Sequence, residues 1–173
     1  PDLKLVTIPS SYDGTLQSFY MWRPENAADE VVPLLVGLHT WSADFSFPFP
    51  GKEALAECRK RRWAFIYPNF RGSNNTPKAC GSKFAVQDIL DAIEWMKVYY
   101  PIDRSRVYAV GGSGGGHMSL MLAAIGQSYV FAGCAAFCPI SDLARWHDQN
   151  GHYGRMMEAA CGGAPKGKPV EYA

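Results

Sequence analysis

Apolar runs alternate along this chain with segments of helical periodicity. Strands are predicted from the apolar runs at residues 3–8, 16–22, 32–38, 63–68, 107–110 and 130–137. Helices are predicted at residues 52–62, 84–99 and 118–125. A turn signal at residues 12–14 separates the first two strands, which we therefore expect to be antiparallel. The alternation that follows is typical of an α/β fold, a mainly parallel sheet with helices on both faces and its functional site at the carboxyl ends of the strands.

The most informative segment is residues 107–124, which predicts a strand, an abrupt turn and a helix. Five glycines surround one serine at this corner, namely Gly111, Gly112, Gly114, Gly115 and Gly116 around Ser113. Glycine relieves the steric clashes of so sharp a turn. The pattern Gly111-x-Ser113-x-Gly115 is that of a nucleophile elbow, which raises a serine oxygen above the carboxyl ends of the strands. Ser113 is therefore the candidate nucleophile.

Two phosphate-binding motifs offer other interpretations of these glycines. The spacing from Gly111 to Gly116 fits a P-loop, but His117 and Met118 stand where a lysine and a hydroxyl residue are needed. A dinucleotide fingerprint that begins at Gly112 ends on His117, and no acidic residue follows before Asp142. A purely structural glycine turn remains an alternative. The pattern favours the nucleophilic serine.

Composition indicates a globular protein with a near-neutral charge. The chain has 173 residues, of which 47% are hydrophobic, with 17 basic and 16 acidic side chains. This length suits a single domain, and this charge gives no reason to expect nucleic acid or an anionic membrane as a partner. Residues 118–141 carry no charge and are long enough to span a bilayer. Because Gly133 and Pro139 interrupt them, we expect a helix and a strand there and no membrane span.

The five cysteines do not show the spacing of a metal site, so we expect no metal. Cys134 and Cys138 fall on a predicted strand and its exit, where buried thiols are common. One disulfide can form if the protein is exported, with Cys80 and Cys161 preferred because they are predicted in polar loops. The sequence does not determine the pairing. It assigns no compartment either, and a secreted or periplasmic location is one option.

Four segments resemble a known family. They are LLVGLHTW at residues 34–41, YPNFRGS at 67–73, AVQDILDAIEW at 85–95 and IDRSRVYAVGGSGGGH at 102–117. Their order and spacing are similar to those of the α/β-hydrolases that include prolyl oligopeptidase-type serine peptidases and acetyl and carbohydrate esterases. The resemblance implies the α/β-hydrolase fold and a serine hydrolase that needs no cofactor. One departure is His39-Thr40-Trp41, where family members more often have His-Gly-Gly.

Attack on an ester or amide carbonyl requires two donors for the oxyanion. The elbow supplies the N–H of Gly114, directly after the nucleophile. In this fold the loop after the third strand supplies the other donor, for which we choose the backbone N–H of Trp41, with Thr40 second. We also expect the indole of Trp41 to form a wall for a sugar or an apolar acyl group.

Three polar residues follow the fourth strand, at the carboxyl end of the sheet. We expect Arg71, Asn74 and Asn75 to line the substrate pocket. A structural ion pair is the alternative for Arg71.

None of the four histidines has the position expected of the general base. His39 precedes the nucleophile and closes the third strand. His117 lies one turn below Ser113 and is predicted to point into the packing. His147 and His152 follow directly after the sixth strand. The fold requires the order serine, acid, histidine, and the resemblance implies that the last two follow further strands.

We therefore expect residues 1–173 to form one hydrolase domain that is incomplete at its C-terminus. Residues 141–173 are expected to be an insertion of loops and short helices, in which Asp142 is a helix N-cap. The general base and its acid are expected outside this chain. The sixth strand is apolar on both faces, so we expect it to pair with the remaining C-terminal part of the same domain.

The motifs and the family resemblance leave three functions open. The first is a serine esterase that acts on an acetylated, feruloylated or similar small-molecule or oligosaccharide ester. The second is a serine peptidase of the oligopeptidase type. The third is a binding module without catalytic activity, against which the intact elbow argues.

Overall fold

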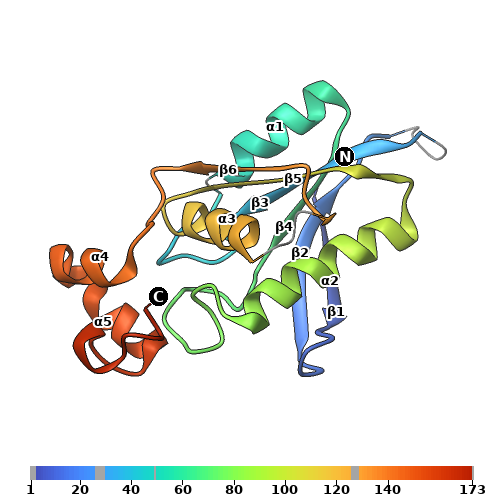
Figure 1. Cartoon of the computed structure of the whole chain (residues 1–173). Coiled ribbons are helices and arrows are strands. Elements are labelled where there is room, and N and C mark those ends of the chain that lie inside the picture. Colours follow the sequence, from blue (N-terminus) through green and yellow to red (C-terminus); the bar gives the residue numbers. More distant parts are fainter. Residues whose placement is uncertain (1–2, 26–29, 49, 126–128, 173) are drawn as a thin grey trace.

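The computed structural model describes residues 3–25, 30–48, 50–125 and 129–172 (Figure 1). The strands are β1 (Lys4–Pro9), β2 (Leu16–Trp22), β3 (Val32–Leu38), β4 (Ala64–Pro68), β5 (Ile102–Gly112) and β6 (Gly133–Phe137). The helices are α1 (Gly51–Arg61), α2 (Lys83–Tyr99), α3 (Gly114–Ala124), α4 (Leu143–Gln149) and α5 (Gly151–Cys161), followed by a 3₁₀ turn, η2 (Pro165–Gly167). The predicted order is confirmed. The third predicted helix begins earlier than expected, because the elbow glycines already form its first turn.

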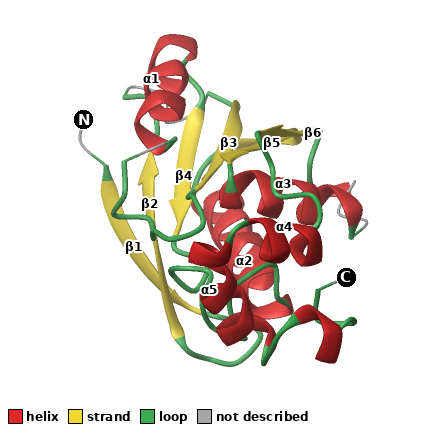
Figure 2. Ribbon diagram, turned by 90° about the vertical axis from the view of Figure 1, so that its left-hand side faces the viewer, coloured by secondary structure: helices red, strands yellow, loops and turns green. Residues whose placement is uncertain are grey.

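The described strands form one mixed sheet in the order β1-β2-β4-β3-β5-β6. The pairs β1–β2 and β2–β4 are antiparallel, whereas β3–β4, β3–β5 and β5–β6 are parallel. Helix α1 covers one face of the sheet, and α2 and α3 cover the other (Figure 2). This is the three-layer arrangement that the alternation of strands and helices predicts. It brings the carboxyl ends of β3, β4, β5 and β6 to one edge, where Ser113 follows β5.

Helix α2 shows how the sequence determines this packing. Its N-cap, Ser82, accepts a hydrogen bond from the N–H of Ala85, as a serine at this position commonly does. The apolar positions of α2 recur every three or four residues and are buried against the sheet, at Ala85, Val86, Ile89, Ala92, Ile93 and Met96. A second cluster, under α1, contains Leu55, Cys58, Phe65 and Tyr67. Both faces of the central strands are therefore covered, which explains their unbroken apolar runs.

The segment after β6 is more regular than expected, since α4 and α5 occupy most of residues 143–161. Asp142 caps α4 by accepting a hydrogen bond from the N–H of Arg145 at 2.8 Å, which confirms its predicted role. The two helices and Trp41 form a third apolar cluster that includes Leu143 and Met157. Across the described part of the chain, every helix is too short or too polar to span a bilayer.

Candidate active site

Ser113 is the single residue between Gly112, which ends β5, and Gly114, which begins α3. Its backbone has φ 54° and ψ −113°, a conformation that residues with a side chain rarely adopt. Two hydrogen bonds fix it there. The N–H of Ser113 donates to the carbonyl oxygen of Phe137 at 2.9 Å, and its own carbonyl accepts from the N–H of His117 at 2.9 Å. The neighbouring strand and helix therefore hold the strained corner that a nucleophile elbow requires.

Close backbone contacts explain the glycines around Ser113. A Cβ on Gly111 would lie 2.2 Å from the carbonyl oxygen of Gly115. A Cβ on Gly115 would in turn lie 2.2 Å from the carbonyl oxygen of Leu38, at the end of β3. No side chain fits at these distances, because backbone atoms cannot move aside without breaking the turn. The glycines are thus needed for the approach of α3 to the sheet.

Gly114 makes the contact of greatest chemical interest. A Cβ there would lie 2.4 Å from the backbone nitrogen of Trp41. The two residues chosen as oxyanion donors are thus neighbours in space. Gly114 is also the first residue of α3, where backbone N–H groups lack partners within the helix and favour negative charge. The placement suits an oxyanion, although its stabilisation by these two N–H groups stays a prediction.

The Trp41 side chain points into the protein. It is 1% exposed, and its ring meets that of Trp146 of α4 edge-on at a centroid distance of 5.2 Å. The His117 ring lies on another side at 6.1 Å. The indole is therefore covered by α4, and its expected contact with substrate stays a prediction. These ring contacts nevertheless fix the position of the Trp41 backbone.

Asn74 holds the Trp41 loop from behind. Its backbone N–H and its Nδ2 donate to the carbonyl oxygen of Trp41 at 3.0 and 3.2 Å. Its Oδ1 accepts from the N–H of Cys80 at 2.9 Å. Asn74 is 2% exposed, whereas Asn75 is exposed. Sequence reasoning placed both at the substrate pocket, and it missed that Asn74 supports the candidate oxyanion loop. No local signal separates the two asparagines.

Arg71 lies in a network of carboxylates. Its Nη2 donates to Asp88 of α2 at 3.0 Å, and its Nη1 donates to Asp13 at 3.0 Å. The Arg71 side chain is 6% exposed. Its hydrogen bond holds the pKa of the Asp13 carboxyl well below the usual range, with a further contribution from Thr15. These contacts agree with the ion-pair alternative, and contact of Arg71 with substrate stays a prediction.

Two of the four histidines, His39 and His117, are buried. His39 directs Nε2 to the carbonyl oxygen of Asn69 at 2.8 Å and stacks on Phe70 at a centroid distance of 3.8 Å. His117 is 8% exposed, and its Nδ1 lies 3.0 Å from the carbonyl oxygen of Ile140, which confirms that it points into the packing. Burial lowers the pKa of both imidazoles. Both rings therefore serve the scaffold.

The other two histidines belong to the helical segment after β6. His147 of α4 directs Nε2 to Oε1 of Glu158 on α5 at 3.0 Å. That hydrogen bond, followed by one to Asp148, raises the pKa of His147. His152 is exposed on α5. The His147–Glu158 contact joins two helices, so it has a structural role that sequence reasoning did not foresee.

Comparisons with known proteins identify the family and the fold. Residues 55–170 match the profile of the prolyl oligopeptidase family. A search of curated proteins found no match. Among solved structures, a Rhizomucor miehei esterase is similar with 21% identity and a TM-score of 0.61, over 82% of this chain and 46% of its own length. This chain thus spans less than half of that esterase.

Two further solved structures share the fold. A fluorophosphonate-binding serine hydrolase of Staphylococcus aureus has 17% identity and a TM-score of 0.70, over 85% of this chain and 60% of its own. A putative dipeptidyl aminopeptidase IV of Bacteroides ovatus has 19% identity and a TM-score of 0.73, over 99% of this chain and 25% of its own. Together with the sheet order, the match over residues 55–170 shows that the chain belongs to the prolyl oligopeptidase family of α/β-hydrolase-fold serine hydrolases.

Proposed function

We propose that this chain carries the nucleophile and both oxyanion donors of a serine esterase. The observation that carries the proposal is the strained Ser113 backbone beside the close contact of Gly114 with the Trp41 nitrogen. Ser113 Oγ attacks the ester carbonyl while a general base takes its proton, and the carbonyl oxygen becomes an oxyanion. Collapse of this intermediate breaks the bond to the alcohol, which leaves with a proton. Water then cleaves the acyl-enzyme and releases the acid.

The N–H groups of Gly114 and Trp41 stabilise the oxyanion in this scheme. Loss of one such donor typically costs about 3 kcal/mol of transition-state stabilisation. The substrate is a carboxylic ester, and we favour an acyl group attached to carbohydrate. Asn75, which is exposed after β4, remains the most accessible of the residues proposed to contact it.

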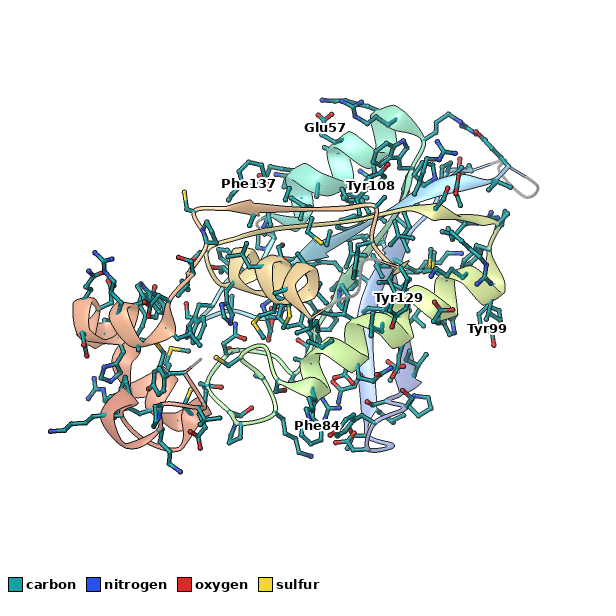
Figure 3. The ribbon with its side chains drawn as sticks, viewed as in Figure 1. Glu57, Phe84, Tyr99, Tyr108, Tyr129 and Phe137 are labelled. Atoms are coloured by element: carbon teal, nitrogen blue, oxygen red, sulfur yellow. The ribbon has the colours of Figure 1, made fainter. Side chains whose placement is uncertain are left out.

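The general base and its acid come from the C-terminal remainder of the domain in this proposal. Support comes from the free side of β6, which pairs with β5 alone among the described strands. Phe137 of β6 is 63% exposed. It lines a groove of about 840 Å³ with Tyr108 and Glu57, between α1 and the last two strands (Figure 3). An apolar strand edge of this kind promotes aggregation unless it is covered.

A fluorophosphonate probe and two substrate panels test the proposal in the natural full-length protein. We expect the probe to label the wild type and not Ser113→Ala. Short nitrophenyl esters should be hydrolysed faster than aminoacyl nitroanilides. Labelling with the opposite preference would support a peptidase of the oligopeptidase type. This remains the second candidate because the structural match to the putative Bacteroides dipeptidyl aminopeptidase IV covers 99% of this chain. Absence of labelling would leave a binding module.

A separate experiment tests the proposal that a C-terminal remainder completes the domain. Residues 1–173 expressed alone should aggregate or bind a hydrophobic dye, and they should show no esterase turnover, because no base reaches Ser113. A soluble monomer of these residues that melts cooperatively and hydrolyses esters would contradict the proposal. His147 and His152 would then be the candidates for the base.

A further inference from the structure

Two cysteines that are far apart in the sequence meet beside the candidate site. Cys80 lies in the loop before α2, and Cys161 is the last residue of α5. Figure 1 shows this loop next to α5. Both residues line one cavity of about 580 Å³, together with His117 and Tyr172. Sequence reasoning expected Cys161 in a polar loop, but it ends a helix and is 8% exposed. The cavity gives a small molecule access to both sulfurs.

Cys80 also packs against the apolar cluster that contains Cys161. Backbone contacts hold each cysteine in place. The N–H of Cys80 donates to Asn74, and its backbone has φ 50°, in the left-handed region. The Cys161 thiol also lies 3.4 Å from the carbonyl oxygen of Glu171. The two cysteines thus lie in one cavity and one apolar cluster of the reduced protein, as a disulfide between them requires.

We propose that Cys80 and Cys161 form a reversible disulfide by exchange with a small-molecule disulfide such as oxidised glutathione. The Cys161 thiolate attacks one sulfur of that molecule, whose S–S bond breaks and releases one glutathione thiolate. The Cys80 thiolate then attacks Cys161 in the mixed disulfide and releases the second. Two cysteine thiols are oxidised, one glutathione disulfide is reduced to two thiols, and the two cysteine protons pass to the released thiolates.

The order of attack follows from the contact between the sulfurs. The hydrogen bond with Cys80 lowers the pKa of the Cys161 thiol, and the same bond, followed by burial, raises the pKa of Cys80. The thiolate is the reactive form of a cysteine, so Cys161 reacts first. Once the Cys161 sulfur is bonded to glutathione, it is no longer a thiolate that disfavours a second negative charge beside it. Cys80 can then ionise and attack.

This disulfide fastens α5 to the loop that supports Trp41. Cys80 bonds to Asn74, which donates to the Trp41 carbonyl, while Cys161 belongs to the apolar cluster that surrounds the Trp41 ring. Oxidation therefore links the loop that holds the Trp41 carbonyl covalently to α5, which packs in the cluster around the Trp41 ring. A cross-link over about 80 residues removes much chain entropy from the unfolded state, so it raises the melting temperature by about 10 °C.

Peptide mapping of the natural full-length protein tests the proposal. The protein is equilibrated in oxidised or reduced glutathione, denatured in an alkylating agent and digested. We expect a linked peptide pair that contains Cys80 and Cys161 in the oxidised sample alone. Cys138→Ser, which removes an exposed cysteine, is the matched control and should keep the linked pair. A link between Cys134 and Cys138, or alkylation of both Cys80 and Cys161 in the oxidised sample, would overturn the proposal.

Thermal unfolding provides a second measurement. The oxidised wild type and Cys138→Ser should melt about 10 °C above their reduced forms, whereas Cys80→Ser should melt at the same temperature in both buffers. In oxidised Cys80→Ser, Cys161 should instead carry glutathione, which adds a defined mass to its peptide. Equal melting temperatures for the oxidised and reduced wild type would contradict the fastening of α5. The outcome does not depend on catalytic activity.

Discussion

The backbone nitrogen of Trp41 lies so close to Gly114 that a single methyl group added to Gly114 would stand 2.4 Å away from it. This contact joins the loop after β3 to the first turn of α3. It also fixes the distance between the two proposed oxyanion donors, the N–H groups of Gly114 and Trp41.

Gly114→Ala is therefore expected to displace the Trp41 loop and to lower kcat for ester hydrolysis by about 10²-fold to 10³-fold, as the loss of one oxyanion donor does. Gly151→Ala is the matched control, because a Cβ there meets nothing within 4 Å. Steady-state kinetics and circular dichroism of the full-length variants check the prediction. Wild-type kcat in Gly114→Ala would show that the Trp41 N–H takes no part.

Two substitutions of Ser113 separate chemistry from backbone strain. Both Ser113→Ala and Ser113→Gly should lower kcat by about 10⁶-fold, the loss expected when the nucleophile of a full triad is removed. Only glycine also relieves the positive φ of 54°. Relief of this backbone strain stabilises the folded state by about 1–3 kcal/mol. The greater freedom of glycine in the unfolded chain offsets part of it, so Ser113→Gly should be about 1 kcal/mol more stable than Ser113→Ala.

Urea unfolding of the two variants measures this difference. Equal stability would indicate that the surrounding strand and helix impose no strain on residue 113. An alanine variant that retains a tenth of the activity would exclude Ser113 as the nucleophile.

The adjacent asparagines offer a test of positioning against substrate contact. Asn74→Ala removes one of two donors to the Trp41 carbonyl and the acceptor of the Cys80 N–H, so it should lower the free energy of unfolding by about 3 kcal/mol. It should also lower kcat more than it changes KM. Asn75→Ala, at an exposed position, should change stability by less than about 0.5 kcal/mol.

Urea unfolding and steady-state kinetics of both variants check this prediction. An increase in KM for Asn75→Ala alone would support substrate contact at Asn75. Wild-type stability in Asn74→Ala would contradict the supporting role of its side chain.

The Arg71 network predicts a dependence of stability on pH. The folded state holds the pKa of Asp13 below its usual value of 3.8, through the hydrogen bond from Arg71 and then that of Thr15. A depressed carboxyl pKa stabilises the folded state fully above the unfolded pKa, and this contribution is lost as the pH falls toward the folded value. Between pH 6 and pH 3 the wild type should therefore lose more stability than Asp13→Asn. Urea midpoints at each pH measure both slopes, and parallel slopes would contradict the prediction.

The local features of the fold could be predicted from the sequence. Apolar runs gave the strands, because a strand buried on both faces needs apolar residues throughout. The sharp strand-to-helix corner at Ser113 was recognisable because a strained corner excludes side chains, and five glycines satisfy that requirement within six residues. Asp142 as a helix cap follows the same logic, since the residue bonds to an N–H only three positions away.

The roles that depend on distant partners were decided by the tertiary structure alone. Asn74 and Asn75 look alike in the sequence, but the position of β3 buries one behind Trp41 and leaves the other exposed. Cys80 and Cys161 meet because α5 folds back onto the loop before α2. The physical reason is that periodicity and glycine content report the backbone near each residue, whereas a hydrogen bond or thiol contact between distant segments depends on how the whole sheet and its helices pack.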